Sequence, residues 1–238
     1  MAVKLKRVLL KISGEQFGGN SGAGIDSKFI NGLAKQLKEV VSTGVQVAVV
    51  VGGGNFARGR DLKVKGLSPT TGHYMGMTAT MLNGMALVDV LESHGQPAHL
   101  QTGFQIEGLA VAFNEEVAKE HLKNGEVLVI MGGTGRPQVT TDTAAVEYAI
   151  RLDCDAVLKA TKVDGVYDKD PLKFPGANRY STLSHKEAYE NPHIEVMDKT
   201  ALSQAMEHKL PIVVFSLMPL KNIEKAVHGE DLGTKVIS

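Results

Sequence analysis

The sequence predicts an α/β protein in which helices cover both faces of a mostly parallel β-sheet. Segments typical of buried strands alternate with segments typical of helices from one end of the chain to the other, a pattern that predicts parallel strands joined by helices. The clearest strand, residues 45–51 (VQVAVVV), is almost entirely apolar, as expected when both of its faces are covered. No internal repeat or linker interrupts the 238 residues, so we expect a single domain.

The N-terminal elements follow from apolar spacing and from capping residues. Residues 7–12 (RVLLKI) form the first predicted strand. A helix capped by Asp26 or Ser27 is predicted to run to Val41, because its apolar residues recur at helical spacing. Strand 45–51 follows that helix.

A long helix is predicted at residues 74–93. It is apolar almost all round, and Asn83, Asp89 and Glu92 are its main polar exceptions. A helix of this composition is buried, and the sequence leaves open whether the protein core or a subunit interface covers it.

The remaining elements continue the alternation, with one exception. Strands are predicted near 97–101, 127–131, 156–160 and 212–215, and helices near 115–123, 142–152, 198–208 and 220–228. Residues 161–172 (TKVDGVYDKDPL) are dense in turn-forming residues, which predicts a hairpin or an excursion beside the sheet.

Composition excludes several classes of protein. Lys+Arg and Asp+Glu both total 26, so the net charge is zero and nothing indicates a nucleic-acid or membrane partner; any anion site must be built locally. Cys154 is the one cysteine, which excludes an internal disulfide and fits a reducing compartment. The longest apolar stretch is too short to span a membrane, and the N-terminal apolar run is too short for a signal peptide. We therefore expect a cytoplasmic protein.

Glycine-rich segments follow three of the predicted strands. They are residues 11–15 (KISGE), 52–59 (GGGNFARG) and 132–142 (GGTGRPQVTTD), and Thr141 or Asp142 can cap the helix that follows the third. Glycine lets the backbone approach a phosphate closely and turn its N–H groups inward. In open parallel sheets such loops meet at the carboxyl ends of the strands, where ligands bind.

Lys11 and Arg58 add one positive charge to each of the first two loops. Phosphoryl transfer requires positioning and charge neutralisation, which cations and inward N–H groups supply. Residues 52–57 fit the dinucleotide pattern G-x-G-x-x-A, but the acidic residue expected about 20 positions later is missing. The chain contains no Gly-Lys dipeptide, so a Walker A loop is excluded. The loops therefore predict a kinase that is not a P-loop kinase.

Several motifs stand in a fixed order along the chain. They are 11–15 (KISGE), 51–59 (VGGGNFARG), 75–77 (MGM), 134–137 (TGRP) with 140–142 (TTD), and 159–167 (KATKVDGVY) followed by 170–171 (DP). Together they resemble the bacterial uridylate (UMP) kinases of the amino-acid-kinase superfamily, over essentially the whole chain. The resemblance implies a three-layer αβα sandwich, similar to carbamate kinase, formed by residues 1–238 as one domain. The N-terminal part would lie mainly on the UMP side, and the part from about residue 155 mainly on the ATP side.

The resemblance also implies an activity: reversible transfer of the ATP γ-phosphate to UMP, giving ADP and UDP in pyrimidine nucleotide (CTP) biosynthesis. It assigns the contacts to ATP to Lys11, Ile12, Ser13, Gly14, Gly54, Arg58, Thr161, Tyr167 and Asp170. It assigns the contacts to UMP to Gly53, His73, Thr134, Gly135, Arg136, Pro137, Gln138, Val139, Thr140 and Thr141. The implied catalytic residues are Lys11, Arg58, Asp142 and Lys162. Mg²⁺ would accompany ATP, and because the eight histidines show no metal-ligand spacing, we expect no metal bound by protein side chains.

Four positions depart from the family's pattern. His73 stands where the family usually has an aspartate that accepts hydrogen bonds from the ribose hydroxyls, Arg136 stands where an asparagine is usual, and Gln138 and Val139 replace two aromatic residues. All four belong to the implied UMP pocket, so the sequence specifies the acceptor less firmly than it specifies ATP.

Partners and alternatives complete the predictions. The resemblance implies a homohexamer and inhibition by UTP, while Ser21 replaces a common acidic residue in the family's GTP-effector loop (19–24), so activation by GTP is left open. One alternative is a kinase of the same fold for another small acid or monophosphate, such as carbamate, an amino acid or an isoprenoid phosphate; the UMP-type loop and the Met-rich helix argue against it. The other is a nucleotide-binding regulator without turnover; the presence of Lys11, Arg58, Asp142 and Asp170 argues against it.

Overall fold

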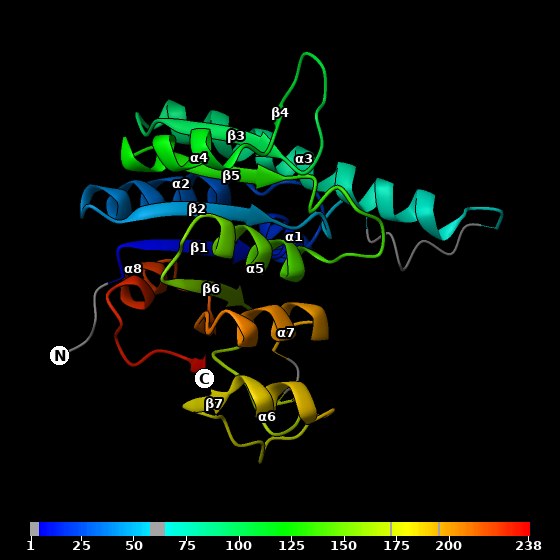
Figure 1. Cartoon of the computed structure of the whole chain (residues 1–238), viewed down its shortest axis with the longest axis vertical. Helices are drawn as coiled ribbons and strands as arrows, with labels where there is room; N and C mark the ends of the chain where they lie inside the picture. Colours follow the sequence, from blue (N-terminus) through cyan, green and yellow to red (C-terminus); the bar gives the residue numbers. More distant parts are fainter. Residues whose placement is uncertain (1–4, 58–64, 172, 195) are drawn as a thin grey trace.

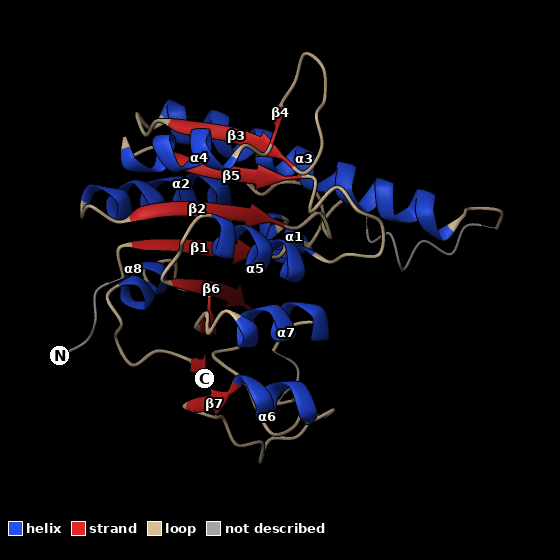
Figure 2. Cartoon of the chain, in the orientation of Figure 1, coloured by secondary structure: helices blue, strands red, loops and turns tan. Residues whose placement is uncertain are grey.

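A central β-sheet organises the computed structural model, which describes residues 5–57, 65–171, 173–194 and 196–238 (Figures 1 and 2). Within these residues the strands are β1 (Arg7–Ile12), β2 (Gln46–Val51), β3 (Ala98–Thr102), β4 (Val111–Ala112), β5 (Val127–Met131), β6 (Ala156–Thr161), β7 (Thr182–Ser184), β8 (Ile212–Ser216) and β9 (Thr234–Ile237). They form one sheet in the order β4-β3-β5-β2-β1-β6-β8-β9-β7. Every neighbouring pair is parallel except the antiparallel pair β8–β9.

Helices cover the two faces of this sheet (Figure 2). They are α1 (Gly14–Phe17), α2 (Ser27–Ser42), α3 (Pro69–Ser93), α4 (Glu115–Lys123), α5 (Thr141–Arg151), α6 (His185–Glu190), α7 (Lys199–Glu207) and α8 (Asn222–Val227), with a short 3-10 turn at Gly19–Ser21. Successive residues of a strand point to opposite faces, so Leu10 of β1 packs with α2, α3 and α8, whereas Leu9 packs with α4, α5, α6 and α7. The predicted three-layer α/β fold with a mostly parallel sheet is confirmed.

Two predicted helix starts need correction. Helix α3 begins at Pro69, five residues before the predicted start, because Ser68 accepts a hydrogen bond from the Thr71 N–H (3.1 Å) and proline suits the first helical position. Helix α5 is capped by Thr140, whose side chain accepts from the N–H groups of Asp142 and Thr143. The prediction had placed this cap at Thr141 or Asp142.

Helix α3 is only half covered by the rest of the chain. Met77, Met81, Leu87 and Leu91 are buried. The large apolar side chains that stay exposed by more than a third on this helix are Tyr74, Met75, Leu82 and Met85 (47, 42, 46 and 38% exposed). The first part of α3 also extends beyond the end of the sheet (Figure 1). Core burial therefore explains one face of the helix, and the subunit-interface alternative stays a prediction for the other.

The shortest elements carry no periodic signal, and β4, β7, β9, α1 and α6 were not predicted from the sequence. After Thr161, the last residue of β6, residues 162–171 leave the sheet as expected. Tyr167 pairs with Arg179 in an isolated antiparallel bridge. The chain then returns through β7 to the edge of the sheet. Strands of two to four residues are too short for alternation to reveal. Among the helices that the structure describes, none is both long and apolar enough to cross a membrane.

Candidate functional site

A cleft of about 890 Å³ opens at the carboxyl ends of β1, β2, β5 and β6. The predicted site residues that line it are Lys11, Ser13, Gly14, Gly53, Gly54, His73, Arg136, Gln138, Val139, Thr140, Thr141 and Asp142. Four sheet-end segments and the N-terminal part of α3 thus meet in one volume, because parallel strands all present their carboxyl ends at the same edge.

The first two glycine loops lie directly against each other. Ile12 and Val51 are partners in the β1–β2 register, so the loops that follow start side by side. A Cβ on Gly14 would lie 2.3 Å from the Gly54 nitrogen, and one on Gly52 would lie 2.7 Å from the Gly14 nitrogen. These glycines are therefore required by backbone packing, whatever ligand the loops hold.

A buried pair of asparagines fixes the second loop. Asn83 of α3 donates from Nδ2 to the Gly52 carbonyl (2.7 Å) and exchanges hydrogen bonds with the Asn55 side chain (2.7 and 2.9 Å). Asn55 also donates to the Gly24 carbonyl (2.6 Å). Asn83 is fully buried, so the polar residue in an otherwise apolar helix positions the Gly52–Asn55 turn. In the sequence alone, Asn83 stands out only as a polar exception in an apolar helix.

Three charged side chains form the floor of the cleft. The Lys11 Nζ lies 2.7 Å from one oxygen of Asp142, and the Lys159 Nζ lies 2.8 Å from the other. Lys11 and Lys159 are partners in the β1–β6 register, so both side chains point to the same face, where α5 begins with Asp142 in its first turn. Lys159 also donates to the Val196 carbonyl (2.5 Å).

The electrostatics of this floor favour an anionic ligand. Burial alone would raise the pKa of Asp142, but the ammonium groups of Lys11 and Lys159 outweigh it and lower that pKa to about 2. Burial lowers the pKa of Lys159, and Asp142 opposes this effect. Asp142 is therefore ionised at neutral pH, and two ammonium groups with one carboxylate leave a net positive charge at the floor.

Lys159 begins the motif 159–167 of the family resemblance, but no role was predicted for Lys159 itself. A lysine inside the strand AVLKAT, in the middle of a covered sheet, was the available signal, since buried charges need partners. Asp198 was also missed. It caps α7 and accepts hydrogen bonds from the hydroxyls of Thr140 (2.5 Å) and Thr143 (2.8 Å), which joins the starts of α5 and α7 at the cleft.

Residues of the predicted UMP pocket lie in or beside the cleft. His73 lines it, and its Nδ1 is buried without a hydrogen-bond partner in the described part of the chain. Arg136 forms an ion pair with Glu147 of α5. Gln138 has a left-handed backbone (φ 67°). Thr134, Gly135 and Pro137 belong to the same loop, but their atoms do not line the cleft.

The other predicted site residues that the structure describes do not line the cleft. Thr161 and Lys162 line a second pocket of about 750 Å³ instead; Glu15 lines both pockets and pairs with Lys162 (2.8 Å). The Tyr167 hydroxyl donates to Asp164 (2.6 Å), and this hydrogen bond raises the pKa of Tyr167.

Two further predicted residues have other surroundings, and a third lies outside the described part of the chain. Asp170 lies 3.3 Å from the Lys173 ammonium group. Ile12 is fully buried in the core, so only its main chain could reach a ligand. Arg58 lies outside the described residues, so its predicted position beside Lys11 stays a prediction.

The family model of the amino acid kinase family matches residues 6–216. This match covers most of the chain, and the chain therefore belongs to the amino acid kinase family. The predicted superfamily is confirmed.

Within this class, solved structures of UMP kinases are similar to the chain over nearly its whole length. The UMP kinase from Bacillus anthracis is 32% identical with a TM-score of 0.94, and the match covers 99% of this chain and 97% of that one. The UMP kinase from Ureaplasma parvum is 29% identical with a TM-score of 0.89, covering 99% and 100%. The uridylate kinase from Archaeoglobus fulgidus is 32% identical with a TM-score of 0.76, covering 96% and 99%.

Proposed function

We propose that this protein is a UMP kinase, which transfers the γ-phosphate of ATP reversibly to UMP and gives ADP and UDP. This reaction belongs to pyrimidine nucleotide (CTP) biosynthesis. The observation that carries the proposal is the Lys11–Asp142–Lys159 floor, which lies where two glycine loops and the start of α5 meet. The full-length similarity to three UMP kinases supports the choice of substrate.

The chemistry requires no general base. The UMP phosphate has a second pKa of about 6 and is largely ionised at neutral pH, so its oxygen is already a nucleophile. Asp142, with a pKa of about 2 and an ammonium group on each oxygen, is too weak a base to accept a proton. Its role is to hold the Lys11 and Lys159 ammonium groups in place.

The barrier lies in bringing two anionic phosphates into line. Lys11 and the N–H groups of the glycine loops stabilise charge on the transferring phosphoryl group. ATP enters as its Mg²⁺ complex, which supplies further charge neutralisation. Both oxygens of Asp142 contact ammonium groups, so this carboxylate is not free to ligate Mg²⁺. The ATP phosphates would hold the Mg²⁺ ion instead.

The two nucleotides occupy different sides of the cleft in this proposal. UMP lies with its sugar toward His73 and its phosphate toward the floor, along Gly53, Arg136 and residues 138–141, which line the cleft. ATP binds with its phosphates over Lys11 to Gly14 and Gly54. Its adenosine extends toward Thr161, Tyr167 and Asp170. On the way it passes the Glu15–Lys162 ion pair, whose Glu15 lines both pockets. Arg58, which lies outside the described residues, is assigned to ATP by the sequence resemblance alone.

Assembly and regulation follow the same proposal. The protein is a cytoplasmic homohexamer inhibited by UTP, and the uncovered apolar face of α3 supports association with further copies. Ser21 replaces a common acidic residue in the loop that corresponds to the family's GTP-effector loop. GTP is therefore to be tested as an effector of the activity. Mass measurement by size-exclusion chromatography with light scattering tests the assembly, and a clean monomer would contradict it.

A coupled assay of ADP release tests the activity. UMP, CMP, dUMP and carbamate are each supplied with Mg²⁺ and ATP, and we expect UMP to give the highest kcat/KM. A faster reaction with another acceptor would assign the chain to the alternative kinase function. Calorimetric binding of ATP and UMP with no ADP release would identify a non-catalytic regulator and overturn the proposal.

A further inference from the structure

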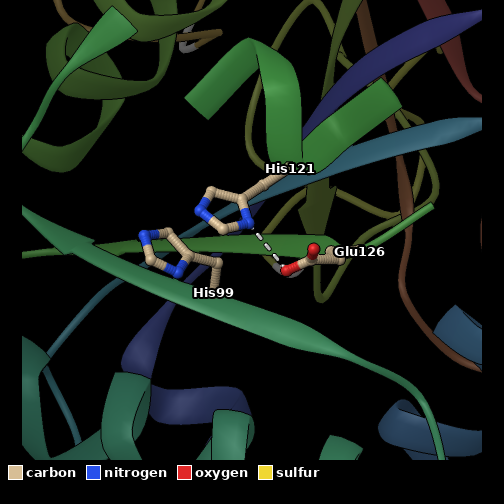
Figure 3. Close-up of side chains that lie close together, drawn as sticks. All are labelled: His99, His121 and Glu126. Carbon is tan, nitrogen blue, oxygen red and sulfur yellow. Dashed lines mark hydrogen bonds and ion pairs between the residues drawn. The ribbon is translucent and has the colours of Figure 1, made fainter. Parts of the chain in front are cut away.

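A second group of reactive side chains lies away from the cleft. His99 on β3, His121 in the last turn of α4 and Glu126 between α4 and β5 each offer one ligand atom, and these atoms lie within 4.8 Å of one another (Figure 3). His99 is near the amino end of its strand, and Glu126 precedes the first residue of β5. The cleft lies at the carboxyl ends, so a strand length of about 15 Å separates the two places.

The backbone holds two members of this group at a fixed spacing. Helix α4 ends in a Schellman motif: the Glu126 N–H donates to the His121 carbonyl (3.1 Å), and the Gly125 N–H donates to the Leu122 carbonyl (3.2 Å). Gly125 takes the left-handed conformation (φ 77°) that this motif requires. His121 and Glu126 are therefore brought together by the helix ending itself, and not by a mobile loop.

The third member is held by the sheet. His99 is the partner of Leu128 in the β3–β5 register, so it lies beside the strand that Glu126 leads into. The Gln96 side chain, which precedes β3, donates to the Gly125 carbonyl (2.9 Å) and ties the two segments together. The three side chains thus project from a strand, a helix end and a turn that are locked to one another, as a pre-organised site requires.

The side chains themselves leave one polar atom unexplained. The His99 and His121 rings stack with centroids 3.6 Å apart and planes 13° apart. The His121 Nδ1 is 2.8 Å from a Glu126 oxygen. The Nε2 of His99 is buried and has no hydrogen-bond partner in the described part of the chain. Buried polar atoms are nearly always satisfied, so an orphaned nitrogen in this group of side chains needs a reason.

We propose that His99, His121 and Glu126 bind a divalent transition-metal ion of the Zn²⁺ type. Two imidazole nitrogens and one carboxylate oxygen are a known ligand set for zinc, with water in the fourth position. Nitrogen-rich ligands favour Zn²⁺, Co²⁺ or Ni²⁺ over Mg²⁺, which prefers oxygen. The ion bound here would thus differ chemically from the Mg²⁺ ion that accompanies ATP.

Binding requires a small rearrangement of the side chains. Ligand atoms about 2.0–2.1 Å from a tetrahedral ion lie roughly 3.4 Å from each other, so the group must contract from its present limit of 4.8 Å. Imidazole lone pairs lie in the ring plane, and the stacked rings must therefore turn toward each other.

This inference revises the sequence expectation that no protein side chain binds a metal. His99 and His121 are 22 positions apart, on different elements, and the spacing matches no local metal motif. Their proximity arises because α4 leads back to β5, which pairs with β3. Only the sheet topology reveals the group.

Zinc titration of the full chain, purified without an affinity tag and stripped with a chelator, tests the proposal. We expect calorimetry to give one Zn²⁺ per chain, unaffected by excess Mg²⁺. Replacing one ligand in His99→Ala, His121→Ala or Glu126→Gln should weaken binding at least roughly tenfold, since even outer-shell partners change metal affinity by 10–100-fold. Co²⁺ should give the intense visible absorption of a four-coordinate ion in the wild type and lose it in each variant.

The matched control is His208→Ala, which removes an exposed histidine on another element and should leave the zinc affinity unchanged. Circular dichroism checks that each variant folds, and Glu126→Gln, which keeps the size of the side chain, serves where an alanine variant does not. Absence of saturable zinc binding by the wild type would overturn the proposal. Equal affinity in Glu126→Gln, His99→Ala and His208→Ala would do the same. Because no nucleotide is present, neither result depends on the proposed kinase activity.

Discussion

Replacement of Asp142 by asparagine tests whether the charged floor is organised as described. The carboxylate contacts the ammonium groups of Lys11 and Lys159 at 2.7 and 2.8 Å, and its side chain is only 15% exposed. An asparagine has the same shape but no charge, so the two lysines lose their counter-ion and repel each other. We expect Asp142→Asn to fold less stably than the wild type and to lose most of its kinase activity.

The pKa of Asp142 sets the size of the effect. It is lowered from 3.8 to about 2, and each pH unit corresponds to about 1.4 kcal/mol, so ionisation of this group stabilises the fold by about 2 to 3 kcal/mol. A depressed carboxyl pKa stabilises the folded state fully above the unfolded pKa, and this contribution is lost as the pH falls from 3.8 toward 2. The difference between wild type and variant should therefore be largest at neutral pH and narrow in acid.

Urea denaturation followed by circular dichroism at about pH 7, 4 and 3 measures this difference. Asp231→Asn removes an exposed carboxylate and serves as the control, with an expected change of less than about 0.5 kcal/mol. If Asp142→Asn unfolds at the same urea concentration as the wild type at pH 7, or if the difference does not depend on pH, the assignment of the floor is refuted.

Three further substitutions test other parts of the site. Lys11→Ala should lower kcat by roughly 100-fold or more while ATP affinity, measured by calorimetry, changes far less, because the ammonium group acts mainly in the transition state; equal turnover would defeat the assignment. Asn83→Ala should cost about 3 kcal/mol in urea denaturation, because the buried Asn55 amide and the Gly52 carbonyl lose their partner; a loss below about 0.5 kcal/mol would show that the second loop does not depend on it. His73→Asp should lower the KM for UMP several-fold with little change in kcat. The reason is that a carboxylate accepts hydrogen bonds from both ribose hydroxyls, whereas neutral imidazole accepts one. An unchanged KM would place the UMP sugar elsewhere.

The local elements could be predicted because their signals are contiguous in the chain. The strands at 7–12 and 127–131 and the helix at 115–123 occur as predicted, since apolar runs and capping residues act over a few neighbouring positions. The first residues of two helices, α3 and α5, were not predicted correctly. The polar first turns of α3 conceal its beginning at Pro69. The cap of α5 is Thr140, just before the predicted Thr141 or Asp142, because Thr140 has an extended backbone and a hydroxyl that accepts from the first N–H groups of the helix.

The sequence by itself determined that glycine loops and a lysine follow buried strands, which is sufficient to indicate a phosphate site. Only the tertiary structure decided which distant residues complete it. The β1–β6 register brings Lys159 beside Lys11, and the start of α5 brings Asp142 between them. The same holds for His99, His121 and Glu126 at the opposite end of the strands. Periodicity and capping are short-range properties, whereas strand order and register are set by the packing of the whole sheet, and no local pattern encodes them.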